Sequence, residues 1–122
     1  MRLLIAVCCV VAWGGVACAE GKHADARGLG LTSCAEYAKA YRTSPDATDY
    51  FFLTWAFGFI SGVNAASEAA YLDLGAKTPD EMKRFLRMYC NDHPLANFGE
   101  AAGELLKSLP IRKRKDDAPA LR

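Results

Sequence analysis

Few residues in this chain have the side-chain types and spacing that chemistry requires. Hydrolytic catalysis needs a nucleophile, a base and an orienting group, and only two histidines, His23 and His93, could take part in such a set. His93 follows Cys90 by three residues, but that pair supplies half of the ligands that a structural zinc site needs. The acid pairs Asp80-Glu81 and Asp116-Asp117 are better explained by a helix start and a solvated tail. We therefore expect no enzyme activity, no metal and no cofactor, and we favour a binding protein.

The first nineteen residues have the pattern of a secretory signal peptide. Arg2 precedes an apolar run over residues 3–13, and Ala17-Cys18-Ala19 fits the small-x-small cleavage pattern, which makes Glu20 the first residue of the mature chain. The run is too short to span a bilayer. A second interpretation makes Cys18 the lipidated first residue of a lipoprotein. Both predict export, and we expect the protein in the periplasm, where thiols are normally oxidised.

Cleavage after residue 19 removes three of the five cysteines and leaves Cys34 and Cys90. Two cysteines permit one internal pairing, so we expect a disulfide between them. Two free thiols or an intermolecular bridge are the alternatives. On the chain-entropy model, closing the loop from Cys34 to Cys90 stabilises the fold by roughly 4 kcal/mol.

The charge of the mature chain is balanced. Without Arg2, fourteen Lys and Arg face fourteen Asp and Glu. A nucleic-acid-binding domain needs a broad basic surface, so we expect no nucleic acid partner. From Pro110 onward five basic residues face two acids, which gives this segment a charge of +3 and the rest −3. A short charge run of this kind is typical of a solvated tail.

Helix start and stop signals divide the mature chain into three parts. Residues 20–31 contain three glycines and no apolar period, which predicts a flexible leader. Residues 32–110 form the predicted helical domain, and residues 111–122 the charged, disordered tail. The first helix runs from 34 to about 42, because Ser33 and Glu36 form a capping box. The second runs from Pro45 to about 74, with Gly75 as a left-handed stop.

The third helix follows Thr78-Pro79 and runs to about 91, and the fourth starts after Pro94 and runs to about 109. No alternating strand pattern is present, so we expect an all-α domain of four helices, or five, in which the disulfide joins helix 1 to the end of helix 3. Lys83, Arg84 and Arg87 form the solvated face of the third helix. The apolar periodicity predicts the following buried positions in the first, third and fourth helices: Cys34, Tyr37, Ala38, Tyr41, Met82, Phe85, Leu86, Tyr89, Cys90, Leu95, Phe98, Ala102, Leu105, Leu106 and Leu109.

The second helix contains an uncharged stretch of 18 residues, 50–67. Its polar residues favour a buried central helix over a membrane span. Four large residues follow one side: Phe52, Trp55, Phe59 and Val63. Small residues that include Gly58 and Gly62 follow another, and each glycine destabilises a helix by about 1 kcal/mol relative to alanine. A close crossing with another helix of the chain is the first explanation, and a homodimer or partner contact through the Gly58/Gly62 face is the second.

Several motifs together resemble the Rap/Tai family of type VI secretion immunity proteins. They are Ser33-Cys34-x-x-Tyr37, Trp55-x-x-Gly58-Phe59-x-x-Gly62 and Tyr89-Cys90-x-x-His93-Pro94, within residues 32–110. Phe59 stands where tyrosine is expected, and His93 where asparagine is commoner. The resemblance implies a small exported helical protein that binds and inhibits a peptidoglycan amidase effector. These framework residues carry the fold and leave the target-binding residues unknown.

The same framework resembles, more distantly, the Hde-type periplasmic acid-stress chaperones, in which one disulfide spans the first and third helices. That likeness implies a promiscuous binder that loosens in acid. A third hypothesis is an envelope protein on the same scaffold without a dedicated ligand. All three predict a periplasmic protein without enzyme activity.

Overall fold

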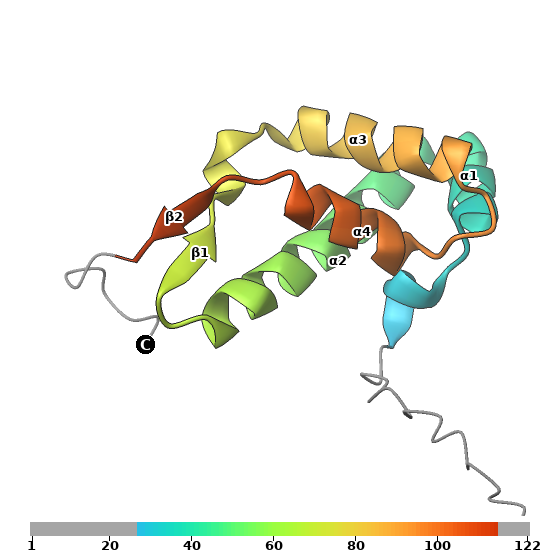
Figure 1. The fold of residues 1–122 in the computed structure, drawn as a ribbon. Coiled ribbons are helices and arrows are strands. Elements are labelled where there is room, and N and C mark those ends of the chain that lie inside the picture. Colours follow the sequence, from blue (N-terminus) through green and yellow to red (C-terminus); the bar gives the residue numbers. More distant parts are fainter. Residues whose placement is uncertain (1–26, 115–122) are drawn as a thin grey trace, which may run out of the picture.

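The computed structural model describes residues 27–114, so the predicted signal peptide, residues 20–26 of the leader and residues 115–122 lie outside the described part. Four α-helices make up most of this part, with a small two-stranded sheet beside them (Figure 1). In chain order the elements are η1 (Gly28–Leu31), α1 (Cys34–Thr43), α2 (Pro45–Ala66), β1 (Ala70–Leu72), η2 (Leu74–Ala76), α3 (Pro79–Asp92), α4 (Phe98–Lys107) and β2 (Ile111–Lys113). The prediction of an all-α fold is confirmed.

Both predicted capping boxes are present. At the start of α1 the Ser33 hydroxyl accepts from the Glu36 amide, and the Ser33 amide donates to the Glu36 carboxylate at 3.1 Å. Thr78 and Glu81 repeat this arrangement at the start of α3. Hydrogen bonds from the Ser33 side chain and then its backbone lower the pKa of Glu36, and bonds from the Thr78 backbone and then its side chain lower that of Glu81. Each helix start is therefore favoured by an ionised glutamate.

α2 ends at Ala66, eight residues before the predicted end near Leu74. The Asn64 side chain accepts from the Leu72 amide at 2.7 Å and donates to the Leu72 carbonyl at 2.9 Å, which turns the chain back along the helix. The Arg114 guanidinium donates to the carbonyls of Asn64 and Ser67. A cation at a helix C-terminus also stabilises the helix dipole. The predicted left-handed stop at Gly75 is wrong, because Gly28 is the glycine with positive φ in the described chain.

β1 and β2 form a sheet that the sequence did not predict. They pair antiparallel, with Tyr71 opposite Arg112, and Arg112 also donates to Asp73 at 3.1 Å. Residues 111–114 are therefore structured, which corrects the predicted start of the disordered tail at 111. The prediction of a flexible leader over residues 20–31 is wrong for its last four residues. Residues 28–31 form a 3-10 helix in which Gly30 is buried.

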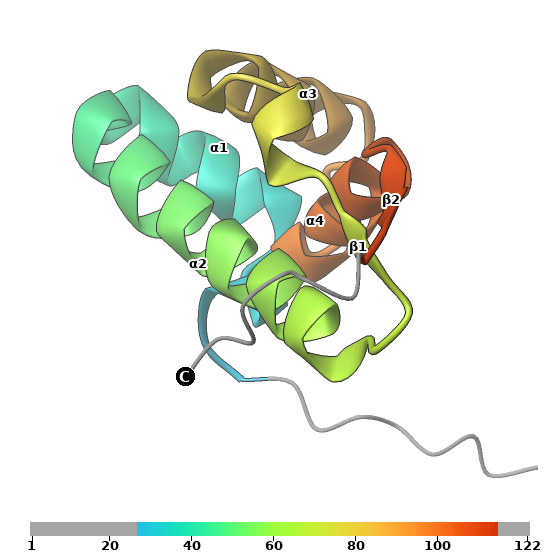
Figure 2. The same ribbon diagram turned by 90° about the vertical axis from the view of Figure 1, so that its left-hand side faces the viewer.

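The core lies where the four α-helices meet (Figure 2). Its centre is an aromatic cluster in which the rings of Tyr37 and Phe52 lie 4.9 Å apart, and Phe98 lies within 5.1 Å of both. The buried set confirms most of the periodicity-based predictions, and its members are Cys34, Tyr37, Phe52, Leu53, Ala56, Ile60, Met82, Leu86, Cys90, Phe98, Ala101, Ala102, Leu105 and Leu109.

Five positions predicted as buried are only half-buried, namely Ala38, Tyr41, Phe85, Tyr89 and Leu106. Two other residues depart further from the prediction. Leu95 was expected to face inward, but it is 97% exposed, because α4 starts at Phe98 with Asn97 as its N-cap and Leu95 lies in the preceding turn. Arg87 was expected on a solvated face. Its side chain instead binds Asp49 at 2.9 Å and lies 4.9 Å over the ring of Tyr41.

Candidate functional site

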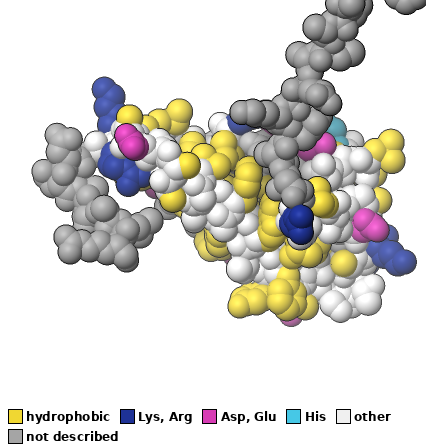
Figure 3. All heavy atoms as spheres, turned by 90° about the horizontal axis from the view of Figure 1, so that it is seen from below, with side chains coloured by type: hydrophobic (Ala, Val, Ile, Leu, Met, Phe, Trp, Pro, Cys, Tyr) yellow, Lys and Arg dark blue, Asp and Glu magenta, His cyan; other side chains and the backbone are white. Residues whose placement is uncertain are grey.

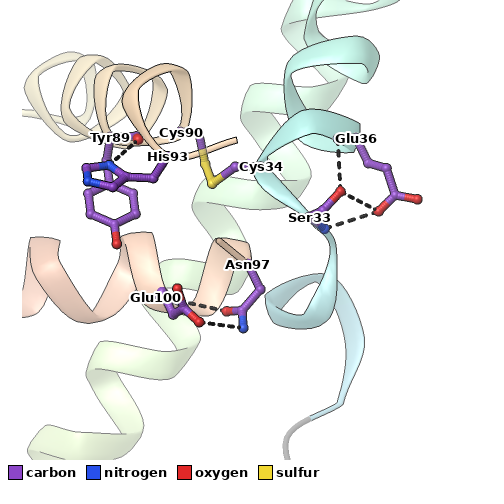
Figure 4. Close-up of a disulfide and its surroundings, with 8 residues drawn as sticks. All are labelled: Ser33, Cys34, Glu36, Tyr89, Cys90, His93, Asn97 and Glu100. Atoms are coloured by element: carbon purple, nitrogen blue, oxygen red, sulfur yellow. Dashed lines mark hydrogen bonds between the residues drawn. A yellow bond between two sulfur atoms is a disulfide. The ribbon is translucent and has the colours of Figure 1, made fainter. Parts of the chain in front are cut away.

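The predicted disulfide between Cys34 and Cys90 is present (Figure 4). It joins the first residue of α1 to the last turn of α3, with Cα atoms 4.7 Å apart, and both cysteines are buried. Its sequence separation of 56 residues places α1, α2 and most of α3 inside one covalent loop. The bridge therefore fixes the end of α3 against the start of α1.

Backbone hydrogen bonds reinforce the frame beside the disulfide. The Cys34 amide donates to the Ala96 carbonyl at 2.8 Å, and the Ala35 amide donates to the Pro94 carbonyl at 3.1 Å. The first amides of α1, which no helical carbonyl can satisfy, are thus bound by the turn before α4. In return the Phe98 amide donates to Thr32. Pro94, a framework residue of the sequence motif, acts here through its carbonyl.

Tyr89 and His93 form the outer side of this frame (Figure 4). Their rings stack at 4.2 Å, and the Nδ1 of His93 lies 2.9 Å from the Tyr89 carbonyl. His93 is the C-cap of α3, and its backbone amide donates to the Tyr89 carbonyl. The histidine is thereby engaged in ending the helix. Among the described residues, no cluster of three His, Cys, Asp or Glu could hold a metal ion.

Trp55 and Phe59, two further motif residues, stack at 5.7 Å with nearly parallel rings. The indole also covers η1, where a Cβ on Gly30 would stand 2.2 Å from the ring. Gly30 is therefore required for this close approach, and its place in the glycine-containing leader was the only sequence signal for it.

Gly58 and Gly62 do not lie at a crossing between helices of the chain. A Cβ on either residue would meet nothing within 4 Å, and both are exposed. The expectation that these glycines allow a close intramolecular crossing is wrong. The buried side of α2 is instead formed by Phe52, Leu53, Ala56 and Ile60, and these lie opposite the glycines on the helix.

The exposed side of α2 carries no charge between Tyr50 and Ala66. Large apolar side chains stand on it: Phe51 is 59% exposed, and Phe59 and Val63 are each 39% exposed. Figure 3, which views the molecule from the side where α2 lies in Figure 1, shows hydrophobic side chains over much of this face. We call this surface the α2 outer face; it consists of Tyr50, Phe51, Thr54, Gly58, Phe59, Ser61, Gly62, Val63, Ala65 and Ala66.

The sequence stretch 50–67 was assigned to a buried helix, and the structure corrects that assignment for one side. None of the helices within residues 27–114 has the length and apolar character needed to cross a membrane. Exposed aromatic and aliphatic side chains without intervening charges are a common mark of protein interaction surfaces. The α2 outer face is therefore the candidate functional site.

Comparisons with known proteins add no relative: no family model, curated protein or solved structure matches this chain.

Proposed function

We propose that this chain is an exported, non-enzymatic binding protein, and specifically an immunity protein that binds and inhibits a peptidoglycan amidase effector delivered by type VI secretion. The observation that carries the binding role is the uncharged α2 outer face on a scaffold clamped by the Cys34–Cys90 disulfide. The resemblance of the framework motifs to the Rap/Tai family supplies the target class. A signal peptide suits this role, since the inhibitor must reach its target in the periplasm.

The glycines of the α2 outer face support packing against a second polypeptide. Gly58 and Gly62 have low helix propensity, and no residue within 27–114 comes within 4 Å of their Cβ positions in compensation. Their spacing of four residues puts both on one side of the helix, where they form a shallow notch. Phe51, two turns before Gly58, stands on the same side. A helix that packs into the notch can come unusually close, because no side chain separates the two backbones.

A second copy of the chain is the occupant that we propose for this notch. In a two-fold dimer the same surface meets itself, so any charge near the axis would face its own copy. The α2 outer face has none from Tyr50 to Ala66, and self-association therefore brings no like charges together. The proposed inhibitor is a homodimer through Gly58 and Gly62.

The dimer is tested by the mass of the mature chain, residues 20–122, in sedimentation equilibrium. We expect a dimer, and Gly58→Leu should give a folded monomer because the new side chain fills the notch. Gly103→Leu in α4 is the matched control, since a Cβ there also meets nothing within 4 Å. A monomeric mature chain, or a Gly58→Leu variant that still forms the dimer, would refute the interface.

The inhibitory function is tested with the product of an adjacent gene that encodes a small secreted amidase. The purified mature chain should bind this amidase in a fixed ratio and stop its release of peptide from peptidoglycan. An amidase that stays fully active with a molar excess of the folded chain contradicts the proposal. The absence of such a neighbouring gene weakens it.

The Hde-like chaperone is the second candidate, and one observation favours it. The capping carboxylates Glu36 and Glu81 have lowered pKa values, so strong acid protonates groups that stabilise the starts of α1 and α3. An acid-loosened fold would expose core surface to unfolding clients. If the chain suppresses the aggregation of unfolded proteins in acid, well below pH 4.5, and does not inhibit the amidase, the chaperone function is favoured over the immunity function.

A further inference from the structure

A small pocket opens between α1 and α3, away from the α2 outer face. Its volume is about 250 Å³, and it is lined by Tyr37, Ala38, Tyr41, Arg42, Arg87 and Asn91. No acidic residue is among them. Every polar side chain in this set can donate a hydrogen bond, which suits an anionic or carbonyl-bearing group.

Tyr37 is the deepest of these residues. Its ring packs against Phe52 and Phe98 in the core and is only 2% exposed. Tyr37 lines the pocket, and its hydroxyl forms no hydrogen bond with another residue of the described chain, so it can donate to water or to a ligand. Burial, and then the nearby negative charge of Asp49, raise the pKa of Tyr37 well above its usual range. The hydroxyl therefore stays protonated and can donate at physiological pH.

Arg87 lines the same pocket as Tyr37 and is held in place by two neighbours. Its Nη1 donates to both carboxylate oxygens of Asp49, at 3.1 and 2.9 Å, and its guanidinium carbon lies 4.9 Å over the ring of Tyr41. Within residues 27–114 its Nε and Nη2 make no hydrogen bond. A guanidinium presents its donors in a rigid plane that matches a carboxylate. Because Asp49 and Tyr41 already immobilise the side chain, a ligand has little ordering entropy to overcome.

The charges around the pocket suit a monoanion. Arg42 and Arg87 contribute two positive charges, and Asp49, bound to Arg87, contributes one negative charge. A single positive charge is left to be balanced. A carboxylate carries one negative charge, whereas phosphate carries more near neutral pH. Asn91, whose amide also lacks a hydrogen-bond partner among the described residues, can donate from α3.

We propose that this pocket binds a carboxylate group, with the free edge of Arg87 and the Tyr37 hydroxyl as its principal donors. The carboxylate has two sources, a free small acid or an acidic side chain presented by a polypeptide. The pocket lies on α1 and α3, whereas the Gly58/Gly62 notch lies on α2. The carboxylate proposal can therefore be tested without assuming either the dimer or the amidase target.

The test is an NMR titration of the ¹⁵N-labelled mature chain with sodium acetate, against sodium chloride at equal ionic strength. The side-chain signals of Arg87 and Asn91 should shift with acetate in a saturable way and stay fixed with chloride. Tyr37→Phe keeps the ring and removes the donor, so acetate affinity should fall on the order of tenfold. Tyr71→Phe, at an exposed tyrosine on β1 outside the pocket, should leave it unchanged.

Two further arms separate the ligand classes. A capped Gly-Glu-Gly peptide that shifts the same signals, while its Gln counterpart does not, identifies an acidic side chain as an accepted source. Acetate binding alone identifies a free acid. Equal shifts with acetate and chloride, unchanged acetate affinity in a folded Tyr37→Phe variant, or saturation by phosphate but not by any carboxylate would each overturn the proposal.

Discussion

Replacing Gly58 by alanine should stabilise the isolated monomer. The added Cβ meets nothing within 4 Å, and Gly58 does not have a positive φ, so neither a clash nor backbone strain opposes the change. The gain is therefore the full difference in helix propensity, about 1 kcal/mol. For a domain of this size that corresponds to a rise in Tm of about 4–8 °C.

The assay is thermal unfolding followed by circular dichroism over a wide range of protein concentration. Gly103→Ala is the matched control, because that glycine also lies within a helix with open space around its Cβ position. At the highest dilution both variants should unfold at a higher temperature than the parent chain. At high concentration the parent gains stability from dimer formation, whereas Gly58→Ala gains less because its new methyl group separates the two helices.

Two results would refute this reasoning. A lower Tm for Gly58→Ala at the highest dilution, with a higher one for Gly103→Ala, would mean that part of the chain covers Gly58. Identical behaviour of the two variants at every concentration would mean that the α2 outer face is not an interface between copies.

Three other changes test the scaffold. Cys34→Ser should destabilise the oxidised protein by about 4 kcal/mol, given the 56-residue separation of the bridge; an unchanged melting curve would show that the bridge is absent. Gly30→Ala should destabilise the fold by about 1–3 kcal/mol through overpacking, because its Cβ would stand 2.2 Å from the Trp55 ring, and tryptophan fluorescence should report the displaced indole. The pKa of Glu36 is lowered from 4.5 in the folded state, so its contribution is present above pH 4.5 and is lost as the pH falls through the lowered value. Glu36→Gln should therefore flatten the fall in Tm as the pH drops below 4.5 and lower the Tm at pH 7; a parallel pH profile would contradict this.

The helix starts were predictable because their signals are local. Ser33 with Glu36, and Thr78 with Glu81, lie within one turn of the bonds that they form, so a short stretch of sequence contains the whole arrangement. The disulfide was predictable for a different reason, since the other three cysteines lie in the predicted signal peptide and only one internal pair remained. These features required no knowledge of the tertiary structure.

The end of α2 was not predictable in this way. It depends on Arg114, which is 50 residues away from Asn64 in the sequence, and on the pairing of β1 with a strand that follows α4. Each strand has three residues, too few to show a period of two. The early end of the helix therefore follows from contacts that no local pattern records.

The candidate site was identified in part. The sequence singled out Gly58, Gly62 and the uncharged stretch around them, but it could not tell which side of α2 the remaining helices cover. The spacing placed Phe59 and Val63 on one side of the helix with Phe52, yet Phe52 is buried and the other two are each 39% exposed. No sequence pattern predicted the proposed carboxylate pocket, because its residues Tyr37 and Arg87 belong to separate helices and line one pocket only in the folded chain.

The position of α4 relative to the disulfide has a consequence for how the core opens. The covalent loop ends at Cys90, and α4 follows it, although α4 supplies Phe98 and Leu105, two fully buried side chains. The centre of the core is thus completed by a segment held only by non-covalent contacts. If α4 leaves the core, the disulfide still closes the loop from Cys34 to Cys90 that contains Tyr37 and Phe52. The disulfide therefore limits how far residues 34–90 can expand, but it does not restrain α4 from leaving the core.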